Sequence, residues 1–210
     1  MIIANFIKGI EFKYKKHYFS GICFDSSKCK KDNIFFAIRG TKIDGSKFIN
    51  HAIQKGAKTI ISNQKFEGIK KNILFIRSSN VRKSLSEFAY TIHKDKPKNI
   101  IAVTGTNGKS SVADFYFQIL KLNKKKVATI GTLGIKTQNY LQKVSNTTID
   151  PIALSIVLNK LKKEGINNVI LEASSHGIKQ NRLDGLKFKT GIFTNLSHDH
   201  LDYHKTFSDY

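Results

Sequence analysis

The sequence predicts an α/β fold in two parts, the second built on a mostly parallel sheet. Short, nearly continuous apolar runs alternate with segments whose apolar residues recur at helical spacing. That alternation is typical of buried strands covered by helices. A polar stretch at residues 93–98, with one of the two prolines of the chain, interrupts the pattern. We therefore expect one domain at residues 1–97 and another at 98–210.

In the first domain, apolar runs bounded by turn residues predict strands, and helical spacing predicts two helices. The expected strands are residues 20–24, 33–38, 58–61 and 72–76, and the expected helices are residues 48–56 and 81–93. The first helix should end at Gly56, because glycine readily adopts the left-handed conformation that follows a helix.

The second domain has the clearer alternation. The expected strands are residues 99–103, 127–130, 168–173 and 191–195, and the expected helices are residues 110–122 and 152–163. Ligands of such sheets bind at the carboxyl ends of the strands. We therefore expect the functional residues in the segments that follow these strands.

Composition limits the class of protein. The net charge is +21, but only four of the 36 basic residues are Arg, and the lysines are scattered. Because Arg dominates base and phosphate recognition, we do not expect a nucleic-acid partner. A positive field that attracts an anionic nucleotide is an adequate explanation.

Other bulk features point to a cytoplasmic protein. No apolar run approaches the roughly 20 residues of a membrane span, and the opening residues lack the pattern of a secretory leader. Cys23 and Cys29 are too few and too close to suggest a disulfide framework. We expect both to be reduced thiols.

A glycine-containing loop follows the strand expected at residues 99–103. It reads Gly-Thr-Asn-Gly-Lys-Ser and precedes a helix, so its amides and the helix dipole would favour phosphate. Its first glycine lies closer to the second than in the usual G-x-x-x-x-G-K-[ST] pattern, and the hexapeptide alone could be an ordinary turn. The flanking strand and helix favour ATP. The expected ATP contacts are Gly105, Thr106, Asn107, Gly108, Lys109, Ser110 and Ser111.

Glu172 ends the apolar run at residues 169–171. A carboxylate at the end of a buried strand, in the same sheet as a phosphate-binding loop, is well placed to bind Mg²⁺ directly or through water. The alternatives are a helix cap or an ion pair with a lysine.

Polar clusters lie near the expected ends of other strands. Residues 198–204 contain three histidines and two aspartates, which suit a magnesium-associated role beside the nucleotide, a zinc site or a plain loop. Their spacing does not match a standard zinc site. Arg182 suits a carboxylate or phosphate, or a surface ion pair. Residues 146–148 could be only a loop and helix cap.

Taken together, these segments resemble the Mur ligases of bacterial cell-wall synthesis, over nearly the whole chain and in one order. The matching segments are residues 25–27, 33–40, 44–45, 103–110, 146–148, 172–182 and 193–204. The resemblance is strongest to members that add the third residue, diaminopimelate or lysine, to UDP-N-acetylmuramoyl-L-alanyl-D-glutamate. It implies a small α/β domain for the uridine nucleotide, followed by a P-loop ATPase-like domain, and a monomer.

The resemblance also implies roles for individual residues. Such enzymes use ATP and Mg²⁺ to phosphorylate the terminal carboxylate of the substrate, and the incoming amine then displaces phosphate. Lys109, Glu172 and His200 would be catalytic, with Ser110, Glu172 and His200 as magnesium ligands. The substrate-binding positions would be Ser26, Asn146, Thr147, Thr148, Ser175, Gln180 and Arg182.

The chain departs from the family in sequence and in length. Ser110-Ser111 stands for the usual Thr-Thr, and Ser27 for the usual Arg after Ser26. The chain stops at Tyr210, near the end of the second of three domains, before an expected carbamylated lysine and the domain that selects the amino acid. By itself it should be catalytically poor. A binding module for UDP-sugar peptides, a folylpolyglutamate-synthetase-like ligase and a nucleic-acid ATPase remain as alternatives.

Overall fold

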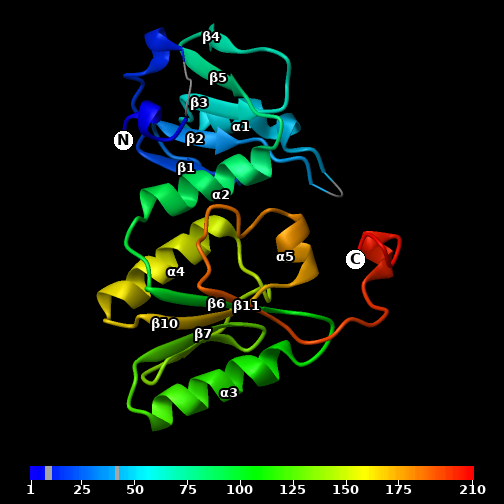
Figure 1. The fold of residues 1–210 in the computed structure, drawn as a ribbon. Helices are drawn as coiled ribbons and strands as arrows, with labels where there is room; N and C mark the ends of the chain where they lie inside the picture. The colour runs from blue at the N-terminus through cyan, green and yellow to red at the C-terminus, as the bar shows by residue number, and fades with distance from the viewer. Residues whose placement is uncertain (8–10, 41–42) are drawn as a thin grey trace. The chain divides into compact units, whose positions relative to one another are not determined.

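The computed structural model describes residues 1–7, 11–40 and 43–210. The chain forms two compact units, Met1–Ile92 and His93–Tyr210 (Figure 1). The polar stretch at residues 93–98 thus begins the second unit. None of the helices in the described ranges combines the length and the apolarity of a membrane span.

The first unit contains a five-stranded sheet in the order β1-β2-β3-β5-β4. Its strands are β1 (Gly21–Cys23), β2 (Asn33–Phe36), β3 (Thr59–Ser62), β4 (Gly68–Lys70) and β5 (Ile73–Arg77), and its helices are α1 (Ile49–Gln54) and α2 (Val81–Ile92). Short 3₁₀ turns are η1 (Ile3–Asn5), η2 (Phe12–Tyr14), η3 (Ser26–Lys28) and η4 (Gly45–Phe48). All neighbours are parallel except β4, which pairs antiparallel with β5. The sequence did not predict β4, because three residues at a sheet edge leave no alternation to detect.

Aromatic side chains fill the core of this unit between the sheet and α2. Phe19, Phe36 and Phe88 are all at least nine-tenths buried. The rings of Phe36 on β2 and Phe88 on α2 meet edge to face with centroids 5.3 Å apart. Such pairs add to the stability from area burial alone. They secure α2 against the sheet.

The second unit contains a six-stranded sheet in the order β11-β6-β10-β7-β8-β9. Its strands are β6 (Asn99–Thr104), β7 (Val127–Gly131), β8 (Gly134–Lys136), β9 (Leu141–Gln142), β10 (Asn168–Glu172) and β11 (Thr190–Phe193). Its helices are α3 (Lys109–Leu122), α4 (Pro151–Lys163), α5 (Ser175–Lys179) and α6 (Leu201–His204). The four strands β11, β6, β10 and β7 run parallel to one another, as expected, whereas β8 and β9 continue from β7 as an antiparallel meander.

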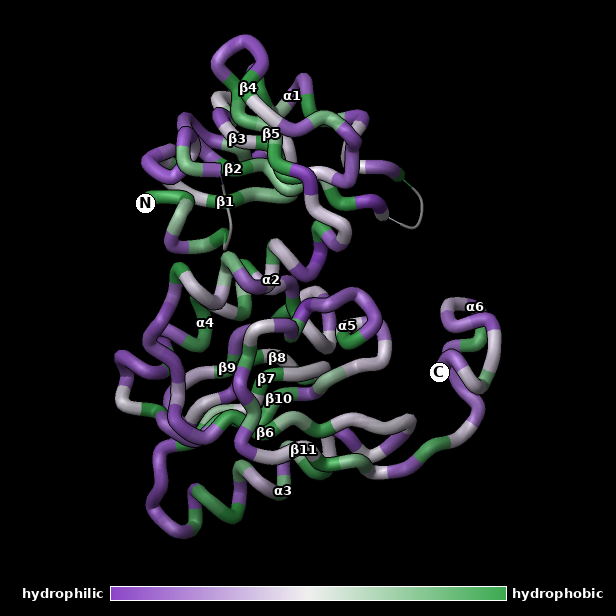
Figure 2. Tube along the Cα trace, turned by 45° about the horizontal axis from the view of Figure 1, so that its top comes forward, coloured by the Kyte–Doolittle hydropathy of each residue, from purple (hydrophilic) through white to green (hydrophobic). Residues whose placement is uncertain are grey.

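Helices cover both faces of this sheet, with α3 on one side and α4 and α5 on the other (Figure 1). Along α3, hydrophobic and hydrophilic residues alternate as an amphipathic helix requires (Figure 2). Its apolar face meets the sheet in a cluster of Val103, Ala113 and Ile170. Because β6 and β10 pair in parallel, their carboxyl ends, which lead into α3 and α5, lie at the same edge of the sheet.

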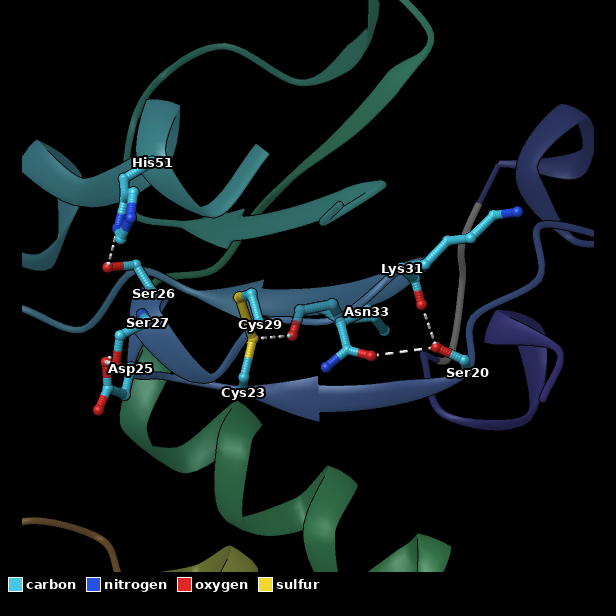
Figure 3. The surroundings of a disulfide bond; sticks show 10 residues. Ser20, Cys23, Asp25, Ser26, Ser27, Cys29, Lys31, Asn33 and His51 are labelled. Atoms are coloured by element: carbon cyan, nitrogen blue, oxygen red, sulfur yellow. Dashed lines mark hydrogen bonds between the residues drawn. A yellow bond between two sulfur atoms is a disulfide. The ribbon is translucent and has the colours of Figure 1, made fainter. Parts of the chain in front are cut away.

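The expectation of two reduced thiols is wrong: Cys23 and Cys29 form a disulfide (Figure 3). The turn η3 lies between them and brings their Cα atoms to 5.8 Å, within the range that a disulfide spans. Both residues are buried. The separation of six residues did not predict a crosslink, because the sequence alone does not show that a turn between the cysteines brings them together.

Replacing both cysteines, as Cys23→Ser with Cys29→Ser, should lower the free energy of unfolding by about 2 kcal/mol, the chain-entropy value for a short loop. Urea unfolding of the variant and the parent measures the change. In parallel, the urea-unfolded parent should resist iodoacetamide until a reductant is added. Labelling of both cysteines without reductant would contradict the disulfide.

Candidate functional site

The loop between β6 and α3 depends on two glycines. Gly105 has φ of 130° and Gly108 has φ of 82°, which side chains rarely adopt. A Cβ on Gly105 would overlap Thr194 Oγ1 and would lie 2.9 Å from the carbonyl oxygen of Asn195. The loop can therefore approach the segment after β11 only if residue 105 has no side chain.

Hydrogen bonds fasten this loop to the segment at residues 194–197. The Thr106 amide donates to Asn195 O at 3.0 Å, and the Ser197 amide donates to Thr106 Oγ1 at 2.9 Å. The Asn107 amide donates to Asn195 Oδ1 at 3.0 Å. The loop after β6 and the segment after β11, which are far apart in the chain, are thus joined by several hydrogen bonds.

The start of α3 is suited to an anion. Gly108, its N-cap, supplies no side-chain cap, so the first amides of the helix are available to a ligand. The Lys109 ammonium folds over the loop and donates to Gly105 O at 2.6 Å and Thr106 O at 2.8 Å. Backbone amides and a cation at one helix start are the groups that bind phosphate.

Glu172, at the end of β10, lies beside this helix start. It is only 3% exposed. Ser110 Oγ donates to its Oε2 at 3.0 Å, Thr132 Oγ1 donates to the same oxygen at 3.0 Å, and the Thr132 amide donates to Oε1 at 3.2 Å. These hard oxygen donors fit Mg²⁺. The structure thus brings together Ser110 and Glu172, as the sequence predicted, and adds Thr132, which the sequence did not single out.

The segment before α4, which contains Thr147 and Thr148, lies beside Glu172 at the end of β10. Thr147 Oγ1 is 3.0 Å from Thr132 Oγ1. Thr148 Oγ1 donates to the carbonyl of Glu172 at 2.8 Å and accepts the Ser174 amide at 2.9 Å. Thr147 and Thr148 are therefore part of one hydrogen-bonded group with Glu172.

Arg182 and Gln180 extend this group. Arg182 Nη1 donates to the carbonyl of Thr148, and its Nη2 donates to Gln180 Oε1 at 2.8 Å. Burial lowers the pKa of Arg182, while Asp150 opposes that shift. An arginine remains charged under such shifts, so the guanidinium stays a cation for an acidic ligand.

Two other expected substrate residues differ in their surroundings. Asn146 is exposed, and its Nδ2 donates to Ser145 Oγ at 3.2 Å. The hydroxyl of Ser175, at the start of α5, is buried and has no hydrogen-bond partner within the described ranges. It belongs to a cavity of about 410 Å³ that Gly105 and Phe193 also line. A ligand that enters this cavity could satisfy it.

Within the described residues, His200 makes no hydrogen bond or ion pair with Glu172. Its ring meets the ring of His176 at a centroid distance of 4.7 Å and also contacts the ring of Tyr210 and the carboxylate of Asp199. Burial, followed by the neighbouring His200 and His204, lowers the pKa of His176. Across residues 1–7, 11–40 and 43–210, no three or more His, Cys, Asp or Glu side chains are grouped to hold a metal ion.

Ser26, the expected uridine-side residue, lies in the first unit. Its hydroxyl is 2.9 Å from Nδ1 of His51 on α1, and it sits in the turn that the Cys23–Cys29 disulfide closes (Figure 3). Asp25 caps this turn by accepting the Ser27 amide at 2.9 Å. The turn is thus held by a crosslink, a cap and a helix side chain.

Two family models match the chain in consecutive regions. Residues 18–100 match the Mur ligase family, catalytic domain, and residues 103–210 match the Mur ligase middle domain. The chain belongs to the Mur ligase family. The matched regions leave only residues 101–102 between them, close to the polar stretch at residues 93–98.

Individual relatives agree with this assignment. A UDP-N-acetylmuramoyl-L-alanyl-D-glutamate–2,6-diaminopimelate ligase of Bradyrhizobium diazoefficiens is 41% identical over 191 residues, which are 91% of this chain and 39% of that protein. The ligase of the same name from Buchnera aphidicola subsp. Schizaphis graminum is 39% identical over 218 residues, covering 98% of this chain and 44% of that protein. This Mur ligase chain thus spans about 40% of the length of such curated relatives.

Solved structures show the same fold. A structure of a UDP-N-acetylmuramoyl-L-alanyl-D-glutamate–2,6-diaminopimelate ligase matches with a TM-score of 0.84 and 30% identity, over 100% of this chain and 43% of that one. The MurF ligase of Thermotoga maritima, in complex with ADP, matches with a TM-score of 0.57 at 17% identity, over 90% of this chain and 40% of that one. The second likeness concerns the fold alone.

Proposed function

We propose that this chain supplies the nucleotide-binding and acceptor-binding parts of an ATP-dependent ligase. That ligase would join an amino acid to UDP-N-acetylmuramoyl-L-alanyl-D-glutamate in peptidoglycan precursor synthesis. The observation that carries the proposal is the contact between Ser110, at the start of α3, and the buried Glu172. This contact supports the proposal, because a helix start that would bind phosphate then lies beside a carboxylate that would bind Mg²⁺.

The residues of the second unit divide the work by their chemistry. The amides of residues 105–111 and the Lys109 ammonium would bind the ATP phosphates and offset their charge. Ser110 and Glu172 would hold Mg²⁺, which would neutralise charge that develops on the transferred phosphoryl group. His200, implied by the family resemblance, is a weaker candidate ligand because its ring contacts His176.

The acceptor would lie on the other side of Glu172. Arg182 and the hydroxyl of Thr147 would orient its acidic peptide, with Asn146, Thr148, Ser175 and Gln180 nearby in the chain. Its terminal carboxylate would take the γ-phosphoryl group of ATP, and the incoming amine would then displace phosphate from the acyl-phosphate. Ser26 in the first unit would contact the uridine nucleotide.

The names of the relatives support diaminopimelate, rather than lysine, as the added amino acid. We also propose that the protein acts in the cytoplasm as a monomer, where the nucleotide-linked precursor and ATP are both available. In this reading the strong positive charge, +21 over the whole chain, attracts two anionic ligands rather than a nucleic acid.

Isothermal titration calorimetry tests the proposal. The 210-residue chain should bind a non-hydrolysable ATP analogue in the presence of Mg²⁺. It should bind AMP at least about tenfold more weakly, because AMP lacks the β- and γ-phosphates that the helix start and Lys109 would bind. It should also bind UDP-N-acetylmuramoyl-L-alanyl-D-glutamate. A folded sample that binds neither ligand at millimolar concentration would refute the proposal.

A further inference from the structure

Thr132 contacts both oxygens of the Glu172 carboxylate. Its amide donates to Oε1 at 3.2 Å and its hydroxyl donates to Oε2 at 3.0 Å. Ser110, by comparison, reaches only Oε2. Thr132 is thus the residue that fixes the plane of the carboxylate as well as its position.

The backbone before Thr132 forms the floor of this arrangement. A Cβ on Gly131 would overlap Oε1 and Cδ of Glu172 and would lie 2.6 Å from its Cγ. The carboxylate therefore lies directly on the main chain at the end of β7. The Gly131 main chain on one side and the two hydrogen bonds from Thr132 together fix the orientation of the Glu172 carboxylate.

The hydroxyl of Thr132 also connects Glu172 to the segment before α4. It has one proton, and that proton is donated to Glu172 Oε2, so the bond with Thr147 Oγ1 at 3.0 Å must be donated by Thr147. The hydrogen bonds therefore run in one direction, from Thr147 through Thr132 to Glu172. Bonds in such a chain polarise and strengthen one another.

We propose that Thr132 is a positioning residue that orients Glu172 for Mg²⁺ and couples it to Thr147 on the acceptor side. The inference rests on the proposed function, in which Glu172 holds the metal. An acceptor bound at Thr147 would then change the hydrogen bonding of the Glu172 carboxylate through Thr132, without contacting Glu172 itself.

The test compares Thr132→Val with Thr132→Ser. Valine keeps the shape and the backbone amide but removes the hydroxyl, whereas serine keeps the hydroxyl. Calorimetry measures ATP-analogue binding as a function of Mg²⁺ concentration. The valine variant should need about tenfold more Mg²⁺ than the parent to reach half of the maximal increase in ATP-analogue affinity, because tenfold corresponds to the loss of one hydrogen bond to a charged group. The serine variant should need a Mg²⁺ concentration within about twofold of that of the parent.

Binding in EDTA should be the same for all three proteins, and Thr91→Val, in α2 of the first unit, serves as a matched control. Thermal melting reports whether each variant is folded. If the parent responds to Mg²⁺ and the valine variant responds identically, the inference is wrong and the proposed function stands. If ATP binding by the parent ignores Mg²⁺, both are wrong.

The coupling to Thr147 has its own measurement. Thr147→Val should shift the Mg²⁺ dependence in the same direction by about twofold, because it weakens the donor that polarises Thr132. In the double variant with Thr132→Val, the second change should add nothing, since the connection is already broken. Additive effects of the two substitutions would overturn the coupling.

Discussion

Replacing Gly105 by alanine should abolish ATP binding and destabilise the second unit, whereas the same change at Gly191 should do neither. At Gly105 the new Cβ would overlap Thr194 Oγ1 and would meet the backbone of Asn195 at 2.9 and 3.0 Å. The residue also has φ of 130°, which alanine adopts only with strain. Together, strain and overlap should cost about 3 kcal/mol.

The loss of binding follows from the same contacts. The loop and the segment at residues 194–197 hold each other through Thr106 and Asn107, so pushing them apart moves the amides that would bind the phosphates. At Gly191, on β11, a Cβ would meet no heavy atom within 4 Å among the described residues other than its chain neighbours, so this position offers a matched control. Urea unfolding and calorimetry measure the two effects. An alanine variant at 105 that binds ATP as the parent does would show that the loop is not the phosphate site.

The sequence predicted the strands that have continuous apolar runs and missed the elements that lack them. β6, β7, β10 and β11 lie where the runs predicted them, within a few residues. The short β8 and β9 mix polar and apolar residues, and α5 has too few residues to show a helical period. Their formation depends on the neighbours that they pair with or pack against, and a single segment does not contain that information.

The site divides in the same way. Ser110 and Glu172 could be paired from sequence because they flank the ends of strands expected in one parallel sheet. In the structure, β10 lies beside both β6 and β7. Thr132 could not be found, because a threonine in a turn is unremarkable. Its contact with Glu172 arises from the register that pairs Ile130 with Leu171 and so brings the next residues to Glu172.

Replacing Glu172 by glutamine should preserve or raise the stability of the metal-free protein and remove its stabilisation by Mg²⁺. No cation lies within ion-pair distance of Glu172 in the described part of the chain, and the side chain is 3% exposed. A buried charge without a counter-ion destabilises the fold that contains it. Glutamine has the same shape, and its NH₂ can face the hydroxyls of Ser110 and Thr132, which can turn to accept.

Without metal, the glutamine variant should therefore be as stable as the parent or more stable, with a melting temperature that does not fall. With metal, the order should reverse. Mg²⁺ and ATP should raise the melting temperature of the parent but not of the variant, whose Mg²⁺ affinity should drop at least about 100-fold with the loss of a charged ligand. Glu67→Gln, at an exposed carboxylate, should leave both quantities unchanged.

A Glu172→Gln variant that is destabilised without metal yet still responds to Mg²⁺ would mean that Glu172 stabilises the fold and does not bind the metal. Opposite signs in the two conditions would instead identify a carboxylate retained for its ligand, since the fold by itself would be better without the charge.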